Sequence, residues 1–547
     1  MGKLVVVGLD GATLDIMRPM FAEGRLKNFA KLSQRGATGV LTSTILPLSA
    51  TAWNTFATGK NPGKHGIYDF SRRVPGTYQH APTTSRDRGG RTLWQYASDA
   101  GRRCLIVNVP LTYPPEPVNG IMISGFPYPE KRRDFALPPE TLDEVEKELG
   151  ITHLHKPSPH FLKPGDERKL VDDMLAITQS QTKVVRHFMK KESWDLVATV
   201  FDATDVVSHF FWQYIDPKNP KYDRKKAEVF GPLFYDVYDS VDTAFGELAA
   251  DLGPEDNTFV ISDHGFGPVY YAVYMNNWLL DNGYLKLRRT AGTRFRRASF
   301  RLGITTDFLF RTAKRLGLVG SHTYAYSGKS RSLELAKKLS LSLDDIDWDR
   351  SEVYSYGNYG QFFINVRGRE PRGMVEPGDR YQKIVGELKE KLRGLRDPKT
   401  GRTLFDIIYT KDEIYSGPYF DMAPDIVFFD STMTYRAHRL FEFGSRSMIA
   451  PDPIYSGSHR MDGVLIAGGP DIAQGADPAG ARLLDLAPTI AHLLGLPVPS
   501  GMDGRVLAGL FRPSSRFASQ KVQYLDEGSA ENLRRATRSL LKAGKRL

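Results

Sequence analysis

Short apolar runs alternate with helical patterns along much of the chain. The run at 3–9 is rich in valine and ends at a polar residue, Asp10. Similar runs follow at 104–109, 196–201, 258–262, 425–429 and 463–467, and helical patterns lie between many of them, as at 140–148, 169–191 and 229–252. Runs that are apolar throughout are typical of strands buried on both faces. Their alternation with helices predicts an α/β domain with a mostly parallel central sheet.

This pattern changes between about residues 274 and 411, where Arg, Tyr and Gly become more frequent and a basic helical pattern runs through 300–316. The strand-like pattern returns at 425, and a polar, basic stretch follows residue 511. We therefore predict four parts: a core domain formed by 1–273 and 412–511, an inserted cap at 274–411, and a basic C-terminal tail at 512–547.

Composition narrows the class of protein. The chain has 547 residues, and 41% of them are hydrophobic. This length is more than one compact domain usually holds. The single cysteine, Cys104, allows no disulfide within one chain and fits a reducing compartment. Because no stretch reaches about 18 uninterrupted apolar residues, we expect no membrane-spanning helix. Together these features predict a cytoplasmic protein.

Positive charge is concentrated in the inserted segment. The net charge is +11, and 286–315 holds many Lys and Arg residues but a single acid, Asp307. Such a stretch attracts anions, which include phosphorylated substrates, acidic lipid headgroups and nucleic acid. A solvated helical face is an equally open interpretation. No specific nucleic-acid motif is evident, and the oligomeric state stays open.

Polar residues follow several of the predicted strands. Asp10 follows the first strand, and Asp263 and His264 follow the run at 258–262. In an open α/β sheet, ligand sites form where loops leave the carboxyl ends of the strands. Asp205 and His209 follow the run at 196–201 and are spaced i, i+4, so on a helix both could reach one metal ion. Each acid taken alone could equally be a turn or N-cap residue.

Two further residues carry candidate chemistry. Ser49 precedes a helical stretch, where backbone N–H groups and the helix dipole favour an anion, and a divalent cation could activate its hydroxyl. It could also serve only as a helix N-cap. His459 lies in a loop just before the run at 463–467, where a lone histidine is more often not a ligand.

Taken together, these residues resemble the alkaline phosphatase superfamily, in particular its type I phosphodiesterase/nucleotide pyrophosphatase branch and a predicted phosphohydrolase/phosphomutase branch. The matching motifs occur in the family's order: Asp10, Ser49 nine residues before Thr58-Gly59, the run at 61–67, Asp205-x-x-x-His209, Ser262-Asp263-His264-Gly265, Gly457-Ser-His459, and a closing helix and loop at 485–504. The resemblance implies an alkaline-phosphatase-like three-layer core and a hydrolase that acts on phosphoric ester bonds.

The resemblance also implies two metal sites. Asp205, His209 and His459 would bind one divalent cation. The other would be bound by Asp10, Asp263, His264 and the oxygen of Ser49, which would also be the nucleophile. Mixed nitrogen and oxygen ligands favour Zn, with Mn or Fe as alternatives. The partner would be a small anionic phosphorylated substrate.

The sequence departs from the family in two places. Many members use Thr as the nucleophile, so an alignment that places Thr51 there is the competing one. Nucleotide pyrophosphatases carry a phosphate-binding Asn where this chain has Phe70, and Arg72 or Arg73 could replace that contact. We expect a phosphodiesterase or phosphomonoesterase. A phosphomutase with a phosphoserine intermediate is the alternative, and a non-catalytic binding protein on the same fold ranks below it.

The inserted cap leaves the core just after Asp263 and His264, so we expect a lid that sets substrate choice. Its basic segment also carries apolar residues, namely Phe300, Leu302, Phe308, Leu309, Phe310 and Leu316. These could instead pack on the core, or rest on an acidic membrane surface.

Overall fold

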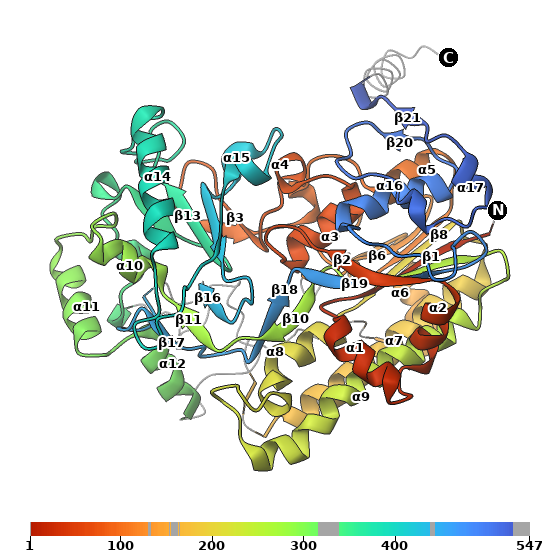
Figure 1. The fold of residues 1–547 in the computed structure, drawn as a ribbon, viewed down its shortest axis with the longest axis horizontal. Coiled ribbons are helices and arrows are strands. Elements are labelled where there is room, and N and C mark those ends of the chain that lie inside the picture. Colours follow the sequence, from red (N-terminus) through yellow and green to blue (C-terminus); the bar gives the residue numbers. More distant parts are fainter. Residues whose placement is uncertain are drawn as a thin grey trace.

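An eight-stranded sheet forms the centre of the molecule (Figure 1). The structure is a computed structural model that describes residues 2–128, 133–152, 154, 162–163, 165–315, 338–437 and 443–528. The strand order is β2-β19-β9-β1-β8-β5-β6-β7. The bounds are β1 Leu4–Leu9, β2 Ala37–Thr42, β5 Cys104–Val107, β6 Gly120–Ile123, β7 Ala136–Leu137, β8 Leu196–Phe201, β9 Asn257–Ile261 and β19 Asp462–Gly468. Strands β9, β1, β8, β5 and β6 are parallel, which confirms the predicted mostly parallel sheet.

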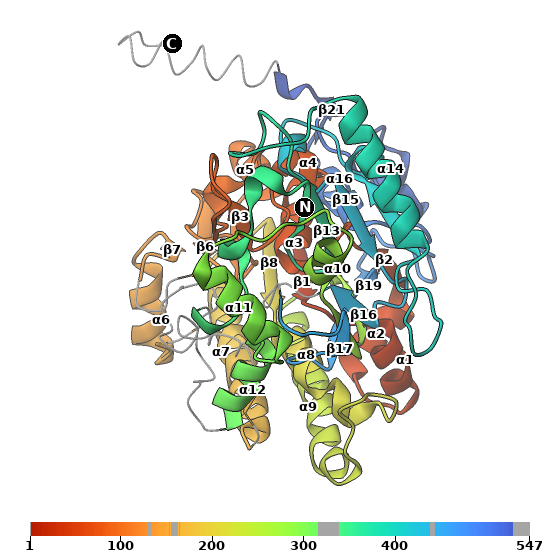
Figure 2. The same cartoon turned by 90° about the vertical axis from the view of Figure 1, so that its left-hand side faces the viewer.

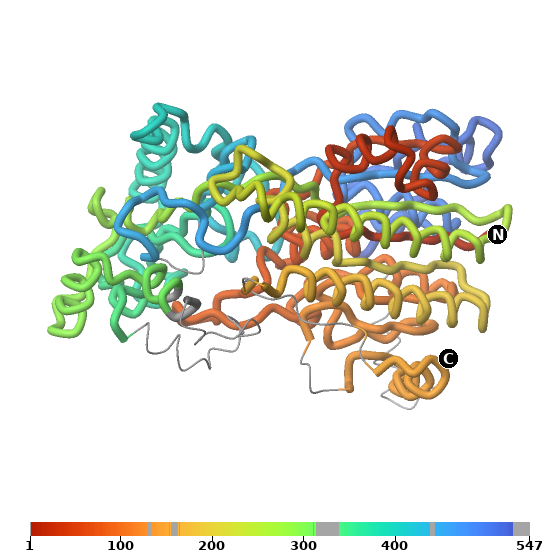
Figure 3. The backbone as a smooth tube through the Cα atoms, turned by 90° about the horizontal axis from the view of Figure 1, so that it is seen from below, coloured from red at the N-terminus to blue at the C-terminus, as the bar shows by residue number. Residues whose placement is uncertain are grey.

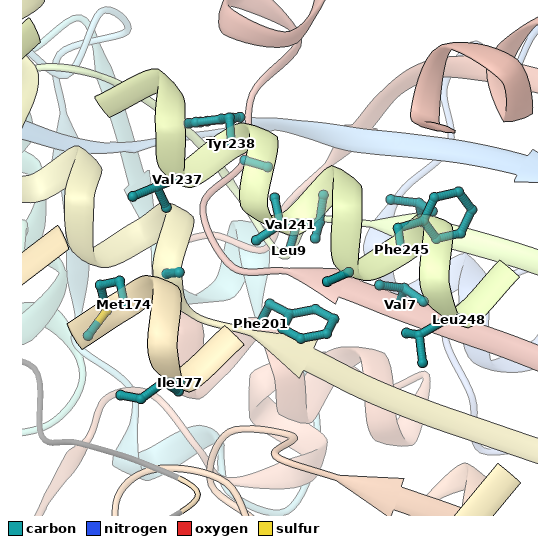
Figure 4. Close-up of a cluster of buried hydrophobic side chains, with 14 of the residues drawn as sticks. Val7, Leu9, Met174, Ile177, Phe201, Val237, Tyr238, Val241, Phe245 and Leu248 are labelled. Atoms are coloured by element: carbon teal, nitrogen blue, oxygen red, sulfur yellow. The ribbon is translucent and has the colours of Figure 1, made fainter. Parts of the chain in front are cut away.

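Helices cover both faces of this sheet because its strands are apolar on both sides. Val5, Val7 and Leu9 of β1 belong to one hydrophobic cluster, whereas Leu4 and Val6 belong to another. Figure 4 shows Val7 and Leu9 beside Val241 and Phe245 of α9. The first face carries α1 Leu14–Ala22, α2 Lys27–Arg35, α6 Thr141–Leu149, α7 Glu167–Lys191, α8 Ala203–Ile215 and α9 Arg224–Ala249, and the second carries α3 Ser49–Thr58, α5 Leu93–Asp99 and α16 Leu486–Leu493. The predicted three-layer core, with helices on both faces of a mostly parallel sheet, is therefore confirmed.

A second group of elements, which we call the outer lobe, has its own hydrophobic cluster. Figure 3 shows it, green to cyan, at the end of the molecule opposite the N-terminus. Its four-stranded sheet has the order β12-β13-β15-β14, and a three-stranded sheet has the order β16-β11-β17. The bounds are β11 Tyr271–Val273, β12 Val353–Ser355, β13 Gly360–Ile364, β14 Ile407–Thr410, β15 Ile426–Phe429, β16 Tyr435–Ala437, β17 Ile449–Pro451, α10 Met275–Asp281, α11 Ala291–Arg301, α12 Thr306–Arg315 and α14 Asp379–Arg393.

Two local predictions need correction. The apolar run at 425–429 was expected in the central sheet, but β15 pairs with β13 and β14 in the outer lobe. All four residues of β15 are buried, and an apolar run indicates burial without indicating which sheet provides it. The basic helical pattern predicted at 300–316 belongs, as far as residue 315, to two helices, α11 and α12, and residue 316 lies outside the described residues. The helices are separated at Gly303, whose φ of 90° would be strained in a residue with a side chain. The four-part division of the chain stays a prediction.

The outer lobe is joined to the core by two adjacent chain segments. Strand β10 (Gly265–Pro268) pairs with β18 (Gly457–Arg460). The chain continues from β10 into β11, and it enters β18 from β17, so the β10–β18 pair leads directly into the three-stranded sheet. The core loops that precede β10 and contain β18 are therefore continuous with the outer lobe.

The C-terminal part of the described chain packs on the core. Strand β21 (Tyr524–Leu525) pairs with β20 (Val498–Pro499), and α17 spans Arg516–Ser519. Residues 529–547 of the predicted basic tail lie outside the described residues. None of the helices in the described ranges is both long and apolar enough to cross a membrane.

Candidate active site

Three neighbouring strands of the central sheet end at one cluster of acids and histidines. Strands β9, β1 and β8 lie side by side and are parallel, so their carboxyl ends meet at one edge. Asp263 follows β9, Asp10 follows β1, and Asp205 lies in the first turn of α8, which follows β8. The cluster thus forms where the sequence pattern predicted it.

Other elements bring in the remaining residues. His209 lies one helical turn after Asp205 on α8, and His264 directly precedes β10. His459 lies on β18, opposite Phe266 of β10. Ser49 is the first residue of α3. The structure therefore brings all seven residues implied by the resemblance together.

All three histidines are held in the same way. The Nδ1 atom of His209 lies 3.1 Å from the carbonyl oxygen of Gly457, and the Nδ1 atoms of His264 and His459 lie 3.0 and 2.7 Å from backbone carbonyl oxygens. Because a carbonyl oxygen only accepts, each Nδ1 carries the hydrogen and each neutral ring keeps a lone pair on Nε2. Burial lowers the pKa of each imidazole, and that of His459 to about 3, so the rings are neutral.

The first group of candidate ligands consists of Asp205, His209 and His459. The Nε2 atoms of the two histidines are 3.1 Å apart, although neither carries a hydrogen to donate to the other. Asp205 Oδ1 lies 3.5 Å from Nε2 of His209 and 3.3 Å from Nε2 of His459, and it is buried without a hydrogen bond among the described residues. Two facing lone pairs beside an unpaired carboxylate oxygen fit a bound cation.

The second group consists of Asp10, Asp205 and His264, with Asp263 beside it. His264 Nε2 lies 3.5 Å from Asp10 Oδ1, 3.2 Å from Asp263 Oδ2 and 4.0 Å from Asp205 Oδ1. Asp263 Oδ2 also accepts no hydrogen bond in the described part of the chain. Asp205 therefore lies between the two groups.

The three carboxylates are electrostatically unfavourable as they stand. Burial raises the pKa of Asp10 and Asp263 well above the ordinary value, and the neighbouring acids raise both further. Burial and the charge of Asp202 raise the pKa of Asp205 to about 8. Removing a carboxylate from water costs several kcal/mol, and neighbouring carboxylates also repel one another. A bound cation would offset both costs because it compensates the negative charge. The donor set therefore fits divalent metal ions.

Ser49 lies against the second group. Its hydroxyl donates to Asp10 Oδ1 at 3.2 Å and lies 3.2 Å from His264 Nε2. Ser49 is not the N-cap of α3: that position belongs to Leu48, which offers no capping side chain. The first-turn N–H groups of α3 are therefore uncapped by a side chain, which favours an anion at this end. The hydroxyl of Thr51 is buried without a hydrogen bond among the described residues.

Some motif residues support the site rather than form it. Asn61 caps α4 (Pro62–His65) by accepting from the N–H of Gly63. Asp503 accepts from the N–H of Asn61 at 2.7 Å and pairs with Lys64 at 2.5 Å. These contacts therefore hold the run at 61–67 against the loop that contains Asp503.

Arg72 and Arg73, the predicted phosphate contacts, lie on β3 (Ser71–Arg73), and both have partners elsewhere in the protein. Arg72 Nε lies 2.6 Å from Asp87 Oδ1, and Arg73 pairs with Glu370 of the outer lobe. Their role in substrate binding stays a prediction. Phe70 contributes no polar group there and packs against the ring of Phe126, 5.7 Å away.

Sequence reasoning missed residues that orient the ligands. The ring of Tyr455 lies 4.4 Å from the ring of His209. The guanidinium group of Arg436 lies over the Tyr455 ring, 4.8 Å from its centroid. Arg436 is buried and pairs with Asp452 at 2.9 Å, and Asp452 accepts from the N–H of Tyr455. The only local signal was that Tyr455 precedes His459 in the same loop. On the other side of the cluster, the indole of Trp53 donates to Asp10 Oδ2 at 2.8 Å, orienting that carboxylate.

The fold and the site together define a hydrolase of the alkaline phosphatase superfamily, a class that depends on divalent metal ions. The chain belongs to the type I phosphodiesterase / nucleotide pyrophosphatase family, whose model matches residues 4–439. Such a protein is a hydrolase acting on phosphoric ester bonds. The matched range contains every candidate ligand except His459.

Solved structures with a similar fold include phosphonoacetate hydrolase from Sinorhizobium meliloti 1021. Its complex with phosphonoacetate has a TM-score of 0.52 and 15% identity, and its complex with phosphonoformate 0.50 and 14%, each covering 89% of this chain and 94% of that one. Human ectonucleotide pyrophosphatase / phosphodiesterase 5 has a TM-score of 0.48 and 13% identity, over 92% of this chain and 97% of its own. No curated protein sequence matches the chain.

Proposed function

We propose that the protein is a metal-dependent phosphoesterase, either a phosphodiesterase or a phosphomonoesterase, that uses Ser49 as its nucleophile and two divalent cations. The observation that carries the proposal is the place of the Ser49 hydroxyl, 3.2 Å from both Asp10 Oδ1 and His264 Nε2. A free serine hydroxyl is a weak nucleophile near neutral pH, and coordination to a divalent cation would activate it by favouring the alkoxide.

The assignment of ligands follows the two groups. Asp205, His209 and His459 would hold one cation, and Asp10, Asp263, His264 and the Ser49 oxygen would hold the other. The imidazole and carboxylate donors support Zn, with Mn or Fe as alternatives. When bound, such cations lower the pKa of a hydroxyl and polarise a phosphoryl oxygen.

The residues of the chain supply orientation and an anion-binding surface. Ser49 Oγ attacks the phosphorus, and the ester oxygen leaves on the opposite side, which forms a phosphoseryl intermediate. The uncapped first turn of α3 stabilises the negative phosphoryl group through its N–H groups. Water then attacks the same phosphorus and releases phosphate or a phosphomonoester from Ser49. Return of the phosphoryl group to the substrate instead of water would make the protein a phosphomutase.

We further propose that the outer lobe acts as a lid that sets substrate choice, with a small anionic phosphorylated compound as the substrate. Support comes from contacts beside the nucleophile: Tyr415 donates to the carbonyl oxygen of Ile45 at 2.7 Å, and Tyr359 lies 3.1 Å from the hydroxyl of Ser458. Leu46 and Leu48, just before Ser49, pack with residues of the outer lobe. A cytoplasmic location, inferred from the single free cysteine, belongs to the same proposal.

The deciding experiment combines elemental analysis with a substrate panel. We expect the purified protein to bind Zn, Mn or Fe, approaching two ions per chain, and to cleave a chromogenic phosphodiester or phosphomonoester. Phosphonoacetate belongs in the panel because a protein of similar fold is a phosphonoacetate hydrolase. Transfer of phosphate between positions of a sugar phosphate, without release, would favour the phosphomutase. A metal-supplemented protein that binds no metal would refute the proposal.

A further inference from the structure

We propose that the outward face of α11, continued by the start of α12, docks on an anionic lipid bilayer. This inference goes beyond the proposed esterase function and does not depend on it. It rests on the arrangement of exposed apolar and basic side chains on one surface of the outer lobe.

An apolar stripe runs along the exposed side of α11. Phe295, Ala298 and Leu302 are spaced i, i+3 and i+7, so they lie on one face of the helix. Phe295 is 58% exposed and Leu302 is 79% exposed. The packed side of the helix includes Thr293 and Ser299, which are buried, and Phe300, which packs against the hydrophobic cluster of the outer lobe. An amphipathic helix in a globular protein normally turns its apolar stripe inward, whereas α11 presents one to solvent.

A stripe of arginines lies beside it. Arg294, Arg297 and Arg301 have the same i, i+3 and i+7 spacing, shifted by one residue, and all three are exposed. None of the three forms an ion pair within the described residues. Arg296, by contrast, turns inward and pairs with Asp345 at 2.5 Å. The three outward arginines are therefore available for an anionic partner.

The start of α12 extends this surface. Phe308 is 53% exposed, and Arg311 is exposed as well. Asp307, the single acid of the segment, is only 4% exposed, so it adds almost no negative surface. Three of the eight large hydrophobic residues that are exposed in the described chain lie in this one segment, which marks it as unusual.

The surface is also placed where a flat partner could reach it. Figure 1 shows α11 at the left-hand margin of the molecule, away from the central sheet, with α12 at the lower edge, and Figure 2 shows both on the side that faces the viewer. A helix that lies on a bilayer combines basic side chains at the headgroups with aromatic and aliphatic side chains in the outer acyl region. Nucleic acid would use the arginines but would leave Phe295 and Leu302 in water, so the observations favour lipid.

The test is flotation of the full chain with vesicles of phosphatidylcholine alone, or with about 30 mol% phosphatidylglycerol. We expect binding to the anionic vesicles only, weakened by salt. The variant R294E/R297E/R301E should lower the partition coefficient by about tenfold or more. The variant F295S/L302S should lower it as well, and its remaining binding should be more sensitive to salt, because only the electrostatic part remains.

The variant K218E/K225E/K226E is the matched control, since it reverses three exposed charges outside α11 and α12, at the start of α9 (Arg224–Ala249) and in the loop before it, and should bind vesicles like the parent. Thermal unfolding of each variant establishes that it is folded, and turnover of a soluble chromogenic ester should be unchanged in all of them. Failure of the parent to bind anionic vesicles would overturn the proposal, as would equal binding by the α11 variants. Binding to RNA without binding to vesicles would also overturn it and assign the surface to nucleic acid.

Discussion

Two buried aspartates in different parts of the molecule have opposite electrostatic character. Asp263 in the candidate site and Asp425 in the outer lobe are both 0% exposed. Burial raises the pKa of Asp263 well above its ordinary value, and Asp10 and Asp205 raise it further. Burial would raise the pKa of Asp425 too, but Arg369 and Lys411 outweigh it and lower the pKa below its ordinary value.

The difference lies in what the chain itself provides. Arg369 donates to both oxygens of Asp425 at 2.7 Å, and the N–H of Ile364 and the hydroxyl of Tyr381 donate as well. Asp263 Oδ2 has no such donor among the described residues. The outer lobe therefore carries its own counter-cation, whereas the central cluster leaves that place to a cation from solution.

The largest expected effect concerns turnover. Because Ser49 Oγ would form the bond to phosphorus, Ser49→Ala should lower kcat by at least about 10³-fold, or roughly 4 kcal/mol. Metal content and the melting temperature should stay near those of the parent, because the acids and histidines remain. Thr51→Ala is the control. A fully active Ser49→Ala beside an inactive Thr51→Ala would place the nucleophile at Thr51.

The second prediction exchanges the roles of the two aspartates. Asp425→Asn leaves the half-buried Arg369 with Glu370 as its remaining charge partner and takes the carboxylate away from the buried Lys411, so the free energy of unfolding should fall by about 2–3 kcal/mol. Metal content should not change. Asp205→Asn should show the opposite behaviour. It should lower the metal content, and it should change the free energy of unfolding of the metal-free protein only slightly. Denaturant unfolding and elemental analysis of both variants measure this. If Asp425→Asn lost metal, the comparison would be wrong.

A third buried acid lies between these two cases. Asp307 accepts from the hydroxyl of Tyr274 at 2.7 Å, but its Oδ1 is unpaired among the described residues, and burial raises its pKa to about 6. The folded state thus holds a proton that the unfolded state releases near pH 4, so the parent loses stability as pH rises from about 4 to 6.

Asp307→Asn removes that titration and keeps an acceptor for Tyr274. Relative to the parent, it should gain roughly 2–3 kcal/mol of stability between pH 4 and pH 8. Denaturant unfolding at both pH values measures the gain. The same stability difference at pH 4 and at pH 8 would show that the carboxyl group of Asp307 is not destabilised by burial.

The smallest expected effect concerns the orientation of a ligand. Tyr455→Leu removes the ring that packs on His209, so metal affinity at the Asp205, His209 and His459 group should fall by about tenfold. Tyr455→Phe keeps the ring and should bind metal like the parent. Competition with a chromogenic chelator gives the affinity. Equal weakening by both variants would assign the effect to the hydroxyl instead of the ring.

Much of the core could be predicted from the sequence because its signals are local. Apolar runs place β1, β8, β9 and β19 within a residue or two, and Asp10 and Asp263 follow their strands directly. The order of motifs then connected Ser49, Asp205, His209 and His459 through a family resemblance. Spacing along the chain was sufficient here because the carboxyl ends of parallel neighbours must meet at one edge of the sheet.

Only the tertiary structure decided features that depend on distant partners. An apolar run such as β15 requires burial, but its strand partners β13 and β14 are chosen by three-dimensional packing. Amphipathic spacing in α11 could not show which stripe faces solvent, since that depends on what packs against the helix. The contact of Tyr455 with His209 joins residues more than two hundred positions apart, and Asp205 lies between both ligand groups only because β8 is next to β1.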